Sequence, residues 1–88
     1  MKTLVLYRPH SDHGQDVEEF IENVKKSGTS RRVEVMNVDT REGMSTASIY
    51  DVTRYPAILV LRDDGISQKL WEGLPLPMLN EVEAYLTS

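Results

Sequence analysis

The stretch Tyr50-Asp51-Val52-Thr53-Arg54-Tyr55-Pro56-Ala57 leads directly into the apolar run Ala57–Leu61. Pro56 has no N–H group for a strand ladder, so the residue predicts that the strand begins just after it. The run Ala-Ile-Leu-Val-Leu carries no polar side chain, which is typical of a strand buried on both faces. Asp63-Asp64-Gly65 then predicts a tight turn, and Ser67–Trp71 an antiparallel return strand.

The chain before this stretch alternates between strand and helix patterns. Thr3–Tyr7 is β-rich and predicts a first buried strand. A helix is expected from Asp12, which would act as its N-cap with Gln15 completing a capping box, to a stop at Gly28. The apolar side chains of this helix recur at helical spacing and form one stripe: Val17, Phe20, Ile21 and Val24.

The remaining elements complete the order βαβαββα. Arg32–Val38 predicts the second strand, and Glu42–Tyr50 a shorter helix whose Met44 and Ala47 face the sheet. Pro77 suits the first turn of a last helix. A strand–helix–strand unit implies parallel pairing and a terminal hairpin implies an antiparallel edge. We therefore expect a single α/β domain over residues 1–88, a mixed four-stranded sheet flanked by helices on both faces.

Composition excludes several classes of function. The 88 residues carry a formal net charge of -4, which argues against nucleic-acid binding and against an anionic membrane surface. The chain has no cysteine, so disulfides, thiolate metal sites and thiol nucleophiles are excluded. With no long apolar segment, a cytoplasmic protein without a membrane span is expected.

The segment from Tyr50 to Ala57 resembles the stretch that precedes the cis-proline of thioredoxins and glutaredoxins. Asp63-Asp64-Gly65 and Gly73 resemble the hairpin turn of that family and the glycine after its last strand. The resemblance spans nearly the whole chain and implies a thioredoxin-like fold with a cis peptide bond before Pro56. It also implies that the family's Cys-x-x-Cys motif falls on Ser11-Asp12-His13-Gly14.

Serine in place of the reactive cysteine is a poor substitute, because a hydroxyl is not appreciably ionised near neutral pH without a dedicated base. We therefore expect no thiol–disulfide activity, no catalytic residue and no cofactor. Gly73-Leu74-Pro75-Leu76 also departs from the glutathione-binding pattern of glutaredoxins. The leading hypothesis is a redox-inactive domain that keeps a peptide- or protein-binding edge beside Pro56.

The residues expected to line this binding edge share one end of the predicted sheet. They are Arg8, His10, Ser11, His13, Arg54, Tyr55 and Pro56.

Two alternatives stay open at the sequence level. The first is a monothiol thioredoxin- or glutaredoxin-type oxidoreductase in which Ser11 replaces a native cysteine. The second is a weak metal or anion binder that uses the turn from His10 to His13. The sequence leaves the partner and the oligomeric state open.

Overall fold

The computed structural model describes residues 2–28 and 33–86, with the side chain of Leu86 excepted. Strands and helices follow one another in the predicted order βαβαββα. Their bounds are β1 Lys2–Tyr7, α1 Gly14–Ser27, β2 Val33–Asn37, α2 Arg41–Ile49, β3 Ala57–Leu61, β4 Ser67–Glu72 and α3 Leu79–Leu86.

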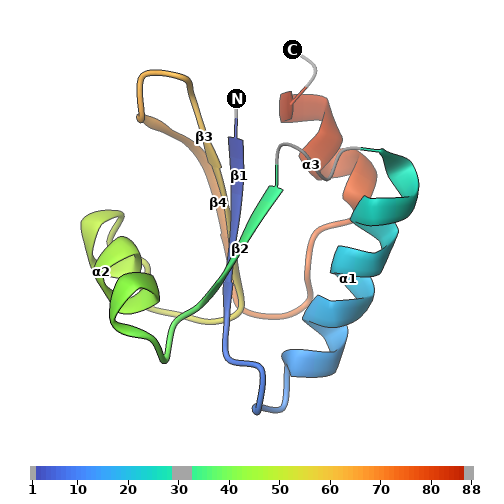
Figure 1. The fold of residues 1–88 in the computed structure, drawn as a ribbon. Coiled ribbons are helices and arrows are strands. Elements are labelled where there is room, and N and C mark those ends of the chain that lie inside the picture. Colours follow the sequence, from blue (N-terminus) through green and yellow to red (C-terminus); the bar gives the residue numbers. More distant parts are fainter. Residues whose placement is uncertain (1, 29–32, 87–88) are drawn as a thin grey trace.

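The strands form one mixed sheet in the order β2-β1-β3-β4. β1 pairs in parallel with β2, whereas β3 is antiparallel to both β1 and β4. Helices α1 and α3 cover one face of the sheet and α2 covers the other (Figure 1). The sequence expectation of a mixed four-stranded sheet with helices on both faces is therefore confirmed.

Alternate side chains of the two central strands build the two halves of the core. Val5, Ile58 and Val60 pack with the α1 stripe and with Val82 of α3. Their neighbours in the strands point the other way, toward α2 and the segment that follows it. Every residue of β3 is buried, as its apolar sequence predicts, because both faces of this central strand are covered.

The start of α1 differs from the prediction. The helix begins at Gly14 with His13 as its N-cap, and no side chain caps it. Asp12 is exposed and stands one residue too early to accept from the first turn, so the predicted capping box is wrong. The predicted stop is correct, since Gly28 has a positive φ of 83°.

The second helix is capped by a residue that the sequence reading missed. The Thr40 side chain accepts a hydrogen bond from the N–H of Gly43 at 3.0 Å, and α2 begins one residue later. Gly43 and Ala47 are the buried residues of this helix. Met44 is 61% exposed, so the prediction that it faces the sheet is wrong. A Cβ on Gly43 would collide with the backbone of Asn37. At this position, the backbone of α2 therefore packs directly against the backbone at the end of β2.

One further boundary differs from the prediction, and another lies outside the described residues. The last helix begins at Leu79, so Pro77 lies before it rather than in its first turn. β2 begins at Val33 in the described residues, and Arg32, the first residue of the predicted strand, lies outside them. No helix among residues 2–28 and 33–86 is long and apolar enough to span a membrane.

Candidate functional site

Four connections meet at one end of the sheet, the lower end in Figure 1. β1 and β2 are parallel, so the loops after Tyr7 and Asn37 leave the sheet together. β3 runs the opposite way and begins at this end, which places Tyr55 and Pro56 beside the loop after β1. The topology therefore brings together segments that lie far apart in the sequence.

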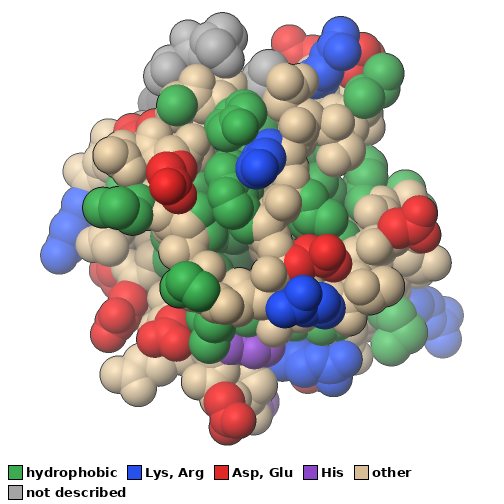
Figure 2. All heavy atoms as spheres, turned by 180° about the vertical axis from the view of Figure 1, so that it is seen from behind, with side chains coloured by type: hydrophobic (Ala, Val, Ile, Leu, Met, Phe, Trp, Pro, Cys, Tyr) green, Lys and Arg blue, Asp and Glu red, His purple; other side chains and the backbone are tan. Residues whose placement is uncertain are grey.

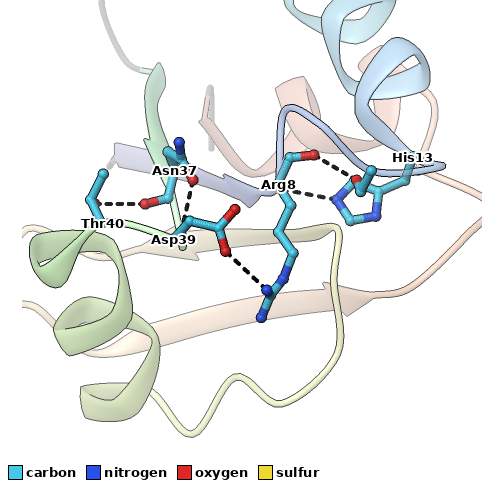
Figure 3. A network of polar contacts seen from close by, with 6 residues as sticks. Arg8, His13, Asn37, Asp39 and Thr40 are labelled. Atoms are coloured by element: carbon cyan, nitrogen blue, oxygen red, sulfur yellow. Dashed lines mark hydrogen bonds and ion pairs between the residues drawn. The ribbon is translucent and has the colours of Figure 1, made fainter.

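The loop between β1 and α1, residues 8–13, is closed by its own hydrogen bonds. The N–H of Arg8 donates to Nε2 of His13 at 3.0 Å (Figure 3). A backbone amide can only donate, so this ring nitrogen must be an unprotonated acceptor. The Ser11 hydroxyl donates to the carbonyl oxygen of Arg8. His13 is 9% exposed, and its ring centroid lies 6.5 Å from that of Tyr7.

The closed loop leaves no room for a side chain at position 14, the last residue of Ser11-Asp12-His13-Gly14. A Cβ placed on Gly14 would collide with the carbonyl oxygen of Pro9. Because the obstacle is backbone, a rotamer change cannot relieve the collision. Gly14 stands where the resemblance puts the second cysteine, so this backbone does not accommodate a dithiol pair.

The Arg8 side chain reaches from this loop to two other segments. Its Nη1 lies 2.9 Å from Oδ1 of Asp39, which follows β2 (Figure 3). The guanidinium carbon lies 5.4 Å from the ring centroid of Tyr55, a cation–π distance. Arg8 therefore joins the loop after β1 both to the loop after β2 and to the turn before β3.

The turn before β3 is held from the side by Glu72 of β4. The Glu72 carboxylate accepts hydrogen bonds from the N–H of Thr53 at 3.0 Å and from the N–H of Arg54 at 3.3 Å. The hydrogen bond from Thr53 is the main reason why the pKa of Glu72 lies below its ordinary value, while partial burial opposes the shift.

The peptide bond between Tyr55 and Pro56 is cis, as the resemblance implied. The carbonyl oxygen of Pro56 accepts a hydrogen bond from the N–H of Gly73 at 2.8 Å, which extends the pairing of β3 with β4. By contrast, no hydrogen bond joins the backbone N–H or C=O of Tyr55 to any other described residue. Tyr55 is thus a half-buried residue at the sheet end with an unused backbone donor and acceptor.

The histidine turn offers little to a metal ion. Nε2 of His13 already accepts from Arg8, and His10 is exposed. Within the described ranges, 2–28 and 33–86, no three His, Cys, Asp or Glu side chains lie close enough together to hold a metal. A metal bound by Nε2 of His13 would first have to displace the Arg8 amide.

The structure brings only some of the predicted binding residues into contact. Arg8 contacts Ser11, His13 and Tyr55 directly. The Arg54 side chain extends over Gly73, where one of its nitrogens lies 3.1 Å from the position of a Cβ. The remaining members of the predicted set occupy different environments: His10 is exposed and Pro56 is buried.

Sequence reasoning missed Asp39 and Glu72, which fix these segments. A signal for Asp39 was present. It follows the second strand as Arg8 follows the first, and the carboxyl ends of parallel strands share one edge of a sheet. Glu72 had no such signal, because its role depends on where the end of β4 lies relative to the turn before β3.

No family model and no curated protein matches this sequence. Among solved structures, the chain is similar to thioredoxin 1 from the thermophilic eubacterium Thermosipho africanus TCF52B. The TM-score is 0.69 at 20% sequence identity, over 99% of this chain and 96% of the other. Similarity at this level of identity establishes the fold, and the chain accordingly has a thioredoxin-like fold without any cysteine.

Proposed function

We propose that this cysteine-free, thioredoxin-like chain binds an extended segment of a peptide or protein at the edge formed by Tyr55 and Pro56. The observation that carries the proposal is the unused N–H and C=O of Tyr55. An extended segment lying beside this residue would pair with both groups, in the manner of a strand added to a sheet edge.

The surroundings of Tyr55 support a preformed site. Its hydroxyl donates to the carbonyl oxygen of Val52 at 3.3 Å, and Arg8 lies over its ring. Glu72 holds the two preceding amides and Gly73 holds the carbonyl of Pro56. A backbone held on both sides loses little freedom when a ligand binds, and this lowers the cost of binding.

The oxidoreductase alternative receives less support. The Ser11 hydroxyl is turned to the Arg8 carbonyl, and Gly14 has no space for a side chain. A cysteine at position 11 would still fit a monothiol enzyme, so the natural codon at this position decides that alternative. The metal alternative is weakened by the His13–Arg8 hydrogen bond.

Amide hydrogen exchange and NMR titration test the proposal. The Tyr55 amide has no partner among the described residues, so we expect it to exchange rapidly in the free protein and to become protected when an extended peptide binds. The probe is a set of acetylated, amidated hexapeptides rich in valine and threonine, added to 15N-labelled protein. Chemical shifts are expected to change at residues 8–14 and 53–57.

A variant isolates the backbone contribution. Tyr55→Pro removes the N–H donor, and we expect peptide affinity to fall about tenfold, as for the loss of a well-placed hydrogen bond. Tyr55→Ala is the matched control, since it loses the aromatic ring as Tyr55→Pro does but keeps the backbone N–H. Equal affinity of both variants, in proteins shown by NMR to be folded, would refute pairing at Tyr55. A cytoplasmic location and the absence of a nucleic-acid partner remain predictions.

A further inference from the structure

A second surface lies away from the Tyr55 edge, between α1 and the segment that connects β4 to α3. It is an open groove of about 1020 Å³. Neither Tyr55 nor any other residue of the proposed peptide edge lines it. In Figure 2, hydrophobic and acidic side chains lie next to one another on the side of α1 and α3, at the left.

Apolar side chains line one wall of this groove. Leu74 is 52% exposed and Met78 is 68% exposed, although both are large and hydrophobic. Phe20 of α1 is 6% exposed and lines the groove between the two walls. Exposed apolar side chains that gather beside a groove are typical of a contact surface.

The wall formed by α1 carries charge in a fixed order. Asp16 and Glu19 lie toward the start of the helix and Lys26 toward its end. Among the described residues none of these three side chains takes part in an ion pair. The groove therefore presents two unpaired carboxylates at one end and an unpaired ammonium group at the other.

The length of the groove favours a short peptide segment over a small molecule. Asp16 and Lys26 are separated by about 15 Å, at 1.5 Å of rise per helical residue. An extended chain covers that distance with about five residues. An open groove of this size would leave much of a small ligand exposed, whereas small-molecule sites enclose most of their ligand.

We propose that this groove binds an extended protein segment that carries a basic residue, about four apolar or small residues and an acidic residue, in that order along the groove. The basic residue lies opposite Asp16 and Glu19, and the apolar residues contact Phe20, Leu74 and Met78. The acidic residue lies opposite Lys26. The proposal is independent of binding at Tyr55, because the two surfaces share no residue.

An NMR titration with a defined peptide tests this site. The probe is an acetylated, amidated hexapeptide with arginine first, glutamate last and alternating leucine and alanine between them. We expect saturable shift changes in residues 16–27 and 74–80 of the 15N-labelled protein. A peptide with glutamate at both ends is expected to bind about tenfold more weakly, because a repulsive pair replaces an attractive one.

Two neighbouring carboxylates of α1 supply a matched pair of variants. Glu19→Lys reverses a charge in the groove, whereas Glu18→Lys makes the same change in net charge on a residue that does not line it. We expect Glu19→Lys to weaken the arginine peptide about tenfold and Glu18→Lys at most about twofold. The peptide with two glutamates is expected to bind Glu19→Lys more tightly than it binds the unchanged protein.

A third variant tests the apolar contact. Met78→Ser alters an exposed side chain, so we expect the fold to be kept and affinity to fall about tenfold. Equal effects of Glu18→Lys and Glu19→Lys would overturn the proposal. So would shift changes confined to residues 53–57, or their absence at millimolar peptide. Shift changes at Leu74 and Met78 that depend on protein concentration alone would assign the groove to a second copy of the chain.

Discussion

The loop after β1 and the turn before β3 lie side by side, but their backbone polar groups differ in hydrogen bonding. In residues 8–13, the N–H and the C=O of Arg8 are both bound, by His13 and by Ser11. In the turn, Glu72 binds the amides of Thr53 and Arg54, but neither backbone group of Tyr55 has a partner in the part of the chain that the structure describes.

The two segments correspond to two different properties of the fold, the position of the reactive thiols and the position of the proposed peptide contact. The loop after β1 is where the resemblance places the reactive thiols. In this chain, the backbone groups of Arg8 in that loop form hydrogen bonds with side chains of the same loop. The turn before β3 is where we propose that an extended segment pairs, and the backbone groups of Tyr55 have no partner there among the described residues. The same thioredoxin-like fold can thus carry no thiol in the loop after β1 and still present unpaired backbone groups at the turn before β3.

Gly14→Ala gives the largest expected change, because it forces a Cβ against the Pro9 carbonyl and disturbs the closed loop. We expect the free energy of unfolding to fall by about 2–3 kcal/mol, as for overpacking in a tight site. Urea denaturation followed by circular dichroism measures the loss. Gln15→Ala, at the next and exposed position, is the control and is expected to change stability by less than about 0.5 kcal/mol. A stable Gly14→Ala protein would show that the loop opens readily and that the backbone at position 14 accommodates a side chain.

His13→Leu is expected to have the next largest effect. The substitution removes the acceptor for the part-buried Arg8 N–H, so the free energy of unfolding should fall by about 1–2 kcal/mol. The same change at exposed His10 provides a matched comparison and should have little effect. Similar losses at both positions would contradict the view that His13 closes the loop.

Glu72→Gln tests the turn before β3 and is expected to have the smallest effect on the free energy of unfolding. The pKa of Glu72 is lowered on folding, so the ionised carboxylate adds stability above its ordinary pKa of 4.5. That contribution is lost as the pH falls through the lower, folded pKa. The variant should therefore be less stable than the parent by about 0.5–1 kcal/mol at pH 7, a range that allows for solvent screening.

Urea denaturation of both proteins at pH 7 and at pH 3 measures this dependence. The stability difference between them should shrink as the pH falls below the ordinary pKa of Glu72, because protonation of the parent carboxylate removes the contribution of its charge. A difference that is the same at both pH values would mean that the charge of Glu72 does not hold the turn. Glu42→Gln, which alters an exposed acid elsewhere, controls for the change in net charge.

Most of the fold was predictable because it depends on local signals. The apolar run before Asp63 predicted a doubly buried strand, and Gly28 predicted the end of the first helix. The prediction of the start of α1 failed because a contact within the preceding loop outweighed the capping signal. Asp12 is a good capping residue, but with the loop closed onto His13 the N-cap falls one residue later, on His13 itself.

The sequence determined the order of the elements, the mixed sheet and the absence of any cysteine. These follow from hydrophobic periodicity, from turn residues and from composition, which are properties of the chain itself. Only the tertiary structure decided that His13 accepts from Arg8 and that Glu72 holds a turn about twenty residues away in the chain. It also decided that the backbone of Tyr55 has no partner within residues 2–28 and 33–86. Such pairings depend on which loops the sheet topology brings to the same end, and a one-dimensional pattern does not specify the distances between them.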